Sequence, residues 1–163
     1  MSVFEKLDLS PLVFRDARGD VTVLYETSTM VLKRSRSFAG VFRGMHWQTS
    51  ESPQNKIIRV VSGRILDFVF DPQDEQAPIY CSTIEPAHGW VRIGAHLAHG
   101  FYAETETVFE YICDGKYSAS NELAFSISEV LERELGLSNL NISPKDKIGR
   151  PVVRKLVRAQ MDL

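Results

Sequence analysis

The stretch KIIRVVSGRILDFVFD, residues 56–71, is the clearest guide to the fold class of this chain. It joins two runs of β-branched and aromatic residues through Ser62 and Gly63, and glycine readily adopts the positive φ that a two-residue turn needs. We therefore predict a β-hairpin here. In its second strand Asp67 stands among apolar neighbours, so a partner is expected for it if it is buried.

Six further runs have the same composition, rich in β-branched and aromatic residues, with turn residues between them. They are VTVLYET (21–27), AGVFRGMHW (39–47), IYCSTIEP (79–86), GWVRIGA (89–95), HGFYAET (99–105) and VFEYICD (108–114). Regular short strands of this kind are typical of an antiparallel all-β domain. Closure into a jelly-roll β-barrel is a usual way for such a chain to remove its sheet edges.

The C-terminal third contains the only helical pattern. In ISEVLERELGL (127–137) the apolar residues fall near one helical face, and Gly136 can end the helix. Residues 138–151 have the composition of a loop, and VVRKLVRAQ (152–160) could form a short terminal helix. The prediction is a single all-β domain over residues 1–163, with short C-terminal helical segments.

Composition excludes several classes of function. The 163 residues are 44% hydrophobic and 25% charged, with a net charge of −2, so nucleic acid is not an expected partner. Cys81 and Cys113 belong to no CxxC motif and predict neither a disulfide framework nor a zinc site. Residues 1–14 lack the shape of a signal peptide, and no run is apolar enough to span a membrane. We expect a soluble, cytoplasmic protein.

The stretch FRGMHWQ (42–48) places a cation and an imidazole in a strand that looks buried. Burying Arg43 is costly unless an anion meets it, so Arg43 and His46 are either a satisfied structural pair or part of a site. Their odd spacing puts them on opposite faces of a flat strand. A bulge is needed for both to reach one pocket, and Gly44 makes that irregularity easy.

The four histidines do not form a metal-binding pattern. Mononuclear metal sites in small β-barrels commonly use an HxH pair, which is missing here because Trp47 and Gln48 follow His46. His96 and His99, three residues apart, would not share a strand face. We expect no metal. His46 and His99 could equally be hydrogen-bonded core residues, whereas His88 and His96 look like loop or edge residues.

Five motifs occur in the order and spacing of a known family. They are FRDARGD (14–20), FRGMHWQ, KIIRVVSGRILDFVFD, LAHGFYAETETVFEYICDGKYS (97–118) and SPKD (143–146). Over roughly residues 8–151 the chain resembles the dTDP-4-dehydrorhamnose 3,5-epimerases, a cofactor-free branch of the cupin jelly rolls. The resemblance implies no cofactor. It also implies a homodimer with exchanged N-terminal strands, an arrangement in which Arg18 could serve the neighbouring pocket.

The reaction that this resemblance implies is epimerisation beside a ketone. The substrate would be a nucleotide-linked 4-keto-6-deoxy sugar, and proton removal next to the C4 carbonyl would give an enolate. Return of a proton to the other face would invert C3, C5 or both. His46 matches the base, Asp146 matches its orienting partner, and Tyr111 matches the acid on the opposite face.

The resemblance also assigns residues that bind the substrate. Lys56 and Arg43 match cations that face the C4 oxygen and the phosphates, and Arg18 matches a phosphate-binding arginine. Asp67 and His99 match a second buried pair. Tyr117 matches a positioning tyrosine. Gln48, the last residue of FRGMHWQ, is also expected to bind the substrate. Arg59, three residues after Lys56, falls on the opposite strand face and is expected to be structural.

Two departures from the family pattern concern the nucleotide. Asp20 and Val23 stand where the family has an aromatic residue and a glutamate that contact thymine, and Val31 and Lys33 replace a glutamine and an asparagine. The base therefore stays open between dTDP, GDP and CDP, and the sugar between hexose and heptose.

Two other classes of function compete with the epimerase. One is a non-catalytic cupin that binds a nucleotide sugar, which would need the cations but not the acid–base residues. The other is a metal-dependent cupin enzyme, against which the missing HxH pair argues.

Overall fold

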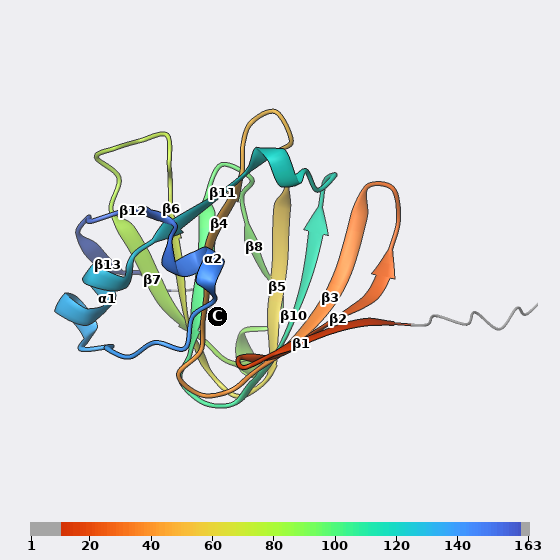
Figure 1. Cartoon of the computed structure of the whole chain (residues 1–163), viewed down its shortest axis with the longest axis horizontal. Helices are drawn as coiled ribbons and strands as arrows, with labels where there is room; N and C mark the ends of the chain where they lie inside the picture. The colour runs from red at the N-terminus through yellow and green to blue at the C-terminus, as the bar shows by residue number, and fades with distance from the viewer. Residues whose placement is uncertain (1–10, 161–163) are drawn as a thin grey trace, which may run out of the picture.

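The computed structural model describes residues 11–160 and consists mainly of two β-sheets that face each other (Figure 1). The predicted all-β cupin-type fold is confirmed. The prediction that no signal peptide is present concerns residues 1–14, most of which lie outside the described part of the chain. No helix within the described residues is long and apolar enough to cross a membrane.

One sheet has six strands and the other has seven. In spatial order the six are β1 (Leu12–Asp16), β2 (Gly19–Glu26), β3 (Met30–Ser37), β10 (Thr107–Asp114), β5 (Asn55–Ser62) and β8 (Val91–Ile93). The seven are β12 (Arg150–Pro151), β11 (Glu122–Ser126), β4 (Phe42–Gln48), β9 (Ala98–Ala103), β6 (Ile65–Phe70), β7 (Ile79–Ile84) and β13 (Leu156–Arg158). Short 3₁₀ turns at Pro86–His88 and Ala119–Asn121 and the helices α1 (Ser128–Leu135) and α2 (Pro144–Lys147) complete the described elements.

The predicted hairpin at residues 56–71 is wrong, although its two strands and its turn exist. β5 pairs with β10 and β8, whereas β6 pairs with β9 and β7 in the other sheet. The turn is therefore a corner at which the chain passes from one sheet to the other. Gly63 has the expected positive φ of +85°, and a Cβ there would collide with the carbonyl oxygen of Glu106.

The C-terminal predictions are confirmed in part. The helix predicted over 127–137 is present as α1, and Gly136 ends it in a left-handed conformation. The tail is not helical, because β13 pairs in parallel with β7. The predicted loop at 138–151 contains the single turn of α2.

The two faces of β6 belong to two different apolar clusters. Leu66 and Phe68 pack with Val130 and Leu131 of α1, so this helix covers the outer face of the seven-stranded sheet. Ile65 faces the space between the sheets and packs with residues of β5 and β10. Asp67 shares this inner face, as the period of two predicts, and points toward the barrel interior.

The strand β4 is irregular at the position predicted from the sequence. Its pairing with β9 shifts between Arg43 and His46, and Gly44 has a φ of +118°. The two glycines Gly44 and Gly100 lie back to back, since a Cβ at Gly44 would come within 2.6 Å of the Gly100 Cα. This close approach brings Arg43 and His46 to the same pocket.

We predict that Gly44→Ala destabilises the fold more than Gly40→Ala. Both glycines have a positive φ, which costs an alanine about 1–3 kcal/mol, but only Gly44 would also place its Cβ against backbone atoms. Urea denaturation should show a loss of about 1 kcal/mol for Gly40→Ala and about twice that or more for Gly44→Ala. Equal losses would mean that β4 and β9 can separate freely at this point.

Candidate active site

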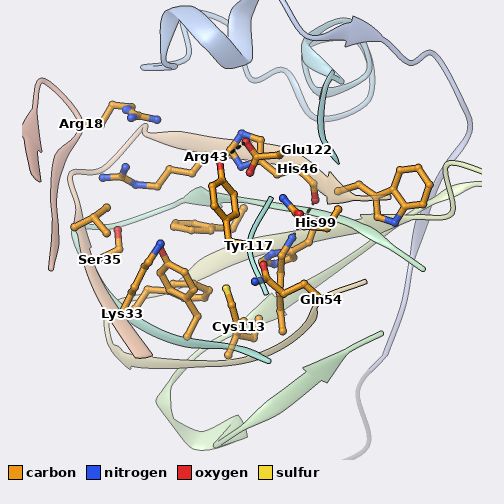
Figure 2. Close-up of a pocket in the computed structure, with 18 residues that line it drawn as sticks. Arg18, Lys33, Ser35, Arg43, His46, Gln54, His99, Cys113, Tyr117 and Glu122 are labelled. Atoms are coloured by element: carbon orange, nitrogen blue, oxygen red, sulfur yellow. Dashed lines mark hydrogen bonds between the residues drawn. The ribbon is translucent and has the colours of Figure 1, made fainter. Parts of the chain in front are cut away.

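A pocket lies between the two sheets and collects most of the residues that the sequence predicted (Figure 2). The predicted residues that line it are Arg18, Arg43, His46, Gln48, Lys56, His99, Tyr111 and Tyr117. The other two, Asp67 and Asp146, stand behind the lining and contact His99 and His46 respectively. All ten predicted residues therefore belong to one region of the structure.

The imidazole of His46 is held by the carboxylate of Asp146. The distance between His46 Nε2 and Asp146 Oδ1 is 2.6 Å, and only 1% of the aspartate side chain is exposed. Asp146 is positioned by α2, in which the Ser143 hydroxyl caps the helix by accepting from the Asp146 backbone N–H at 3.0 Å. Its second oxygen accepts from the Gly44 N–H at 3.4 Å. A carboxylate that accepts from Nε2 leaves Nδ1 as the basic nitrogen of the neutral ring.

A second buried pair joins the strands β9 and β6. His99 Nε2 lies 2.7 Å from Asp67 Oδ1, and both side chains are 8% exposed. The aspartate that looked out of place among apolar residues thus has the partner expected for it. Because His99 lines the pocket and Asp67 lies behind it, the carboxylate fixes the orientation of the ring.

Lys56 and Arg43 enter the pocket from opposite sheets. The Lys56 ammonium donates to the backbone oxygen of His46 at 3.0 Å, and burial lowers its pKa. The Arg43 guanidinium donates to the Ser37 hydroxyl at 2.9 Å, and burial lowers its pKa as well. Neither cation forms an ion pair with a carboxylate of the described residues, so both are available to an anionic ligand.

Arg18 reaches the pocket of its own chain. Its guanidinium is bound by Asp16 at 2.7 Å, and it lies 3.5 Å from Asp146. In the single chain, therefore, Arg18 contributes to the same pocket as His46. The expected exchange of N-terminal strands between two subunits stays a prediction.

The two predicted tyrosines differ in their surroundings. Tyr111 lies on β10 among apolar neighbours, with its ring centroid 5.6 Å from that of Phe109, and burial raises the pKa of its phenol. Tyr117 lies at the mouth, is 53% exposed, and donates to Glu122 at 3.3 Å. Its pKa is raised first by partial burial and then by the charge of Glu122. Tyr111 is thus the more secluded phenol.

Gln48 lines the pocket and has one amide donor without a partner among the described residues. Its Oε1 accepts from the Ser118 N–H at 3.1 Å, which fixes the amide, while its Nε2 is buried and has no partner among the described residues. A buried amide donor without a partner is unfavourable unless a ligand or water accepts from it. The predicted binding of a ligand by Gln48 stays a prediction.

Several pocket residues were missed by the sequence analysis, among them Ser35, Gln54, Cys113 and Glu122. Cys113 could have been found, because it lies two residues after Tyr111 and therefore on the same strand face. Glu122 had no such local signal. It accepts from Tyr117 and pairs with Lys145 of α2, and both contacts depend on the tertiary fold.

Residues that were expected outside the site are indeed outside it. Arg59 points to the outer face of its sheet, where it binds Glu110 at 2.6 Å and stacks on Trp90 at 4.6 Å. His88 and His96 do not line the pocket. Within the described residues, no group of three or more His, Cys, Asp and Glu side chains is arranged to hold a metal ion.

Two comparisons with known proteins, one with models of protein families and one with individual relatives, identify the same family. The model of the dTDP-4-dehydrorhamnose 3,5-epimerase family matches residues 2–152. The enzyme of that name from Salmonella typhimurium is 30% identical over 134 residues, which cover 71% of this chain and 72% of the relative.

Solved structures of such epimerases share the fold. The one from Sulfolobus tokodaii is 25% identical with a TM-score of 0.60, covering 86% of each chain. The dTDP-6-deoxy-D-glucose-3,5-epimerase from Legionella pneumophila, solved with dTDP-4-keto-L-rhamnose, is 24% identical with a TM-score of 0.63. It covers 87% of this chain and 85% of its own.

Fold and pocket together define a cupin-type β-barrel of the kind that nucleotide-sugar epimerases use. The chain belongs to the dTDP-4-dehydrorhamnose 3,5-epimerase family. Its enzyme class is accordingly that of a nucleotide-sugar epimerase, an isomerase.

We predict that Asp146 makes the free energy of unfolding depend on pH in the acidic range. Burial alone would raise the pKa of Asp146, but the bonds from His46 and the Gly44 N–H lower it below the usual 3.8. A lowered pKa stabilises the fold fully above about pH 4, and this contribution is lost as the pH falls through the native value. In urea unfolding, Asp146→Asn should lose stability at pH 7 and lose less on acidification than the wild type. Parallel losses would assign the acid sensitivity to other carboxylates.

Proposed function

We propose that this enzyme inverts C3, C5 or both in a nucleotide-linked 4-keto-6-deoxy sugar, within a single catalytic domain. One observation carries the proposal: His46 and Tyr111 line the same pocket from opposite sheets, β4 in one and β10 in the other. Inversion needs a base on one side of the sugar ring and an acid on the other. A pocket between two facing sheets supplies both sides.

His46 is the proposed base. With Nε2 held by Asp146, the neutral ring presents Nδ1 as the nitrogen that accepts the proton. Removing the proton beside the C4 carbonyl leaves the electron pair of the C–H bond in an enolate. The carboxylate of Asp146 then stabilises the imidazolium that forms, as orienting carboxylates do for catalytic histidines.

Lys56 and Arg43 are the proposed stabilisers of negative charge. The enolate oxygen at C4 gains charge as the proton leaves, and fixed cations in a partly dry pocket stabilise it strongly. Lys56 donates to the backbone of His46 itself, so its ammonium lies beside the base. Arg43 and Arg18 remain for the diphosphate, with Gln48 Nε2 as a further donor to the substrate.

Tyr111 is the proposed acid. Because burial raises the pKa of this phenol, it stays protonated and neutral over the working range of pH. It can therefore give its proton to the carbanion carbon from the β10 side, and the phenolate would then recover a proton before the next turnover. The exposed Tyr117 and the pair formed by Glu122 and Lys145 stand at the mouth, where the nucleotide would enter.

The names of the relatives favour dTDP as the nucleotide. The Salmonella enzyme and the Legionella enzyme are both named after a dTDP-linked sugar. Val21 lines the pocket, whereas Asp20 and Val23, the positions matched to thymine contacts, do not. The proposed contacts to the base therefore stay open, and GDP and CDP belong in the first test.

We predict that the protein exchanges substrate protons with solvent. In D2O, proton NMR of 4-keto-6-deoxy sugars carrying dTDP, GDP or CDP should show loss of the C3 signal, the C5 signal or both. His46→Ala should abolish exchange, since His46 is the proposed base and its backbone oxygen accepts from the Lys56 ammonium.

Tyr111→Phe separates exchange from inversion. It should keep deuterium incorporation at the first position while reducing formation of the inverted product, since the base remains and the opposite-face acid is gone. Tyr25→Phe, at an exposed position outside the pocket, is the matched control. Binding without any exchange would favour the non-catalytic cupin instead.

We also propose that the enzyme is a homodimer. The edge strand β1 exposes Leu12, Val13 and Phe14, of which Leu12 and Phe14 are each 62% exposed. An open strand edge with apolar side chains favours pairing with another chain.

We predict that sedimentation equilibrium of the full chain gives the mass of a dimer. The double change Leu12→Glu and Phe14→Glu should shift it toward the monomer, because charge is placed on the exposed apolar strand. Val153→Glu, also at an exposed apolar position, should leave the mass unchanged. A monomeric wild type would exclude the dimer.

A further inference from the structure

The inner face of β3 is a polar stripe that leads into the pocket. Residues of β3 alternate, so Lys33, Ser35 and Ser37 point inward while Arg34 and Arg36 point outward to glutamates. Ser37 accepts from Arg43, and the Ser35 and Ser37 hydroxyls are 3.3 Å apart. Lys33 is the next residue along this face, is half-buried, and lines the pocket.

The charges around the pocket do not balance. Four cations line it, namely Arg18, Lys33, Arg43 and Lys56, but Glu122 is the only carboxylate among the described lining residues. Glu122 is already paired with Lys145, and Arg18 with Asp16. The Lys33 ammonium has no hydrogen bond or ion pair with any residue of the range 11–160, although its backbone is paired in the sheet. Three cations without a carboxylate partner indicate a strongly anionic ligand.

Strand register places Lys33 close to the proposed chemistry. Lys33 is directly opposite Tyr111 across β3 and β10, and Lys56 is directly opposite Cys113 across β5 and β10. Directly paired residues have Cβ atoms about 5 Å apart. Figure 2 shows Lys33 on the same side of the pocket as Ser35 and Arg43, across from His99.

The charge of Lys33 is a property of this chain rather than of the family pattern. The pattern that the chain resembles has an asparagine here, whose amide can bind a neutral or an anionic group. A lysine offers three donors with a full positive charge and no acceptor, so it selects for anionic oxygen.

We propose that Lys33 is a specificity-determining residue that binds an anionic oxygen group of the substrate on the β3–β10 side of the pocket, next to Tyr111. This inference rests on the proposed function, because it takes the ligand to be a nucleotide sugar. The diphosphate bridge supplies such oxygens, because a 6-deoxy sugar has a methyl group at C6 and carries no carboxylate there.

Calorimetric titration with three probes tests whether Lys33 binds the diphosphate. The probes are inorganic pyrophosphate, dTDP-glucose and dTDP-glucuronate, and only the last carries a carboxylate at C6 of its sugar. If Lys33 binds a phosphate, Lys33→Asn should weaken all three about tenfold or more, as expected for a charged hydrogen bond. A loss confined to dTDP-glucuronate would instead place Lys33 at the sugar and would contradict the binding of a phosphate.

Two further variants serve as controls. Lys33→Arg keeps the charge and should retain most of the affinity, whereas Lys155→Asn removes an exposed lysine outside the pocket and should change nothing. Affinities within twofold of the wild type for Lys33→Asn, or no binding of any probe by the wild type, would overturn the inference. Binding of pyrophosphate alone, dependent on Lys33, would support it while counting against the proposed function.

Discussion

The close approach of two glycines, Gly44 on β4 and Gly100 on β9, is the constraint on which the site depends. A regular strand would send Arg43 and His46 to opposite faces, one into the pocket and one into the core beneath α1. Because neither glycine has a side chain, the backbones meet, the register shifts, and both functional side chains reach the pocket. The same shift brings the Gly44 N–H to Asp146, which holds His46.

The charged groups of the barrel differ in where they lie and in whether they are paired. On the outer face of the six-stranded sheet, Glu110 is neutralised by Arg34 and Arg59. Between the sheets, the carboxylates of Asp67 and Asp146 are each bound to a histidine. Three of the pocket cations, Lys33, Arg43 and Lys56, by contrast lack a carboxylate partner among the described residues. This difference separates groups that stabilise the fold from groups that await a ligand, because an unpaired buried charge costs free energy in the empty protein.

Local patterns predicted the strands that are rich in β-branched and aromatic residues, and the irregularity at Gly44. They missed β3, since its charged side chains alternate with serines and lack an apolar face. The hairpin was wrong because turn chemistry at Ser62 and Gly63 predicts a reversal but not which strands then pair. Residues 152–160 were predicted as a short helix. Their parallel partner, β7, lies far away in the sequence, so no local pattern indicates a strand there. Asp146 looked like an ordinary loop residue until the family resemblance gave it a role.

The contact between His46 and Asp146 joins residues one hundred positions apart in the chain. During synthesis at about 5–20 residues per second, the histidine therefore precedes its aspartate by roughly 5–20 s. Until α2 has been made, the His46 imidazole has no carboxylate partner, and Glu122 of β11 has no Lys145. A nascent chain can thus pair most of its strands before His46 and Asp146 meet, so the pocket is completed only after α2 has been synthesised.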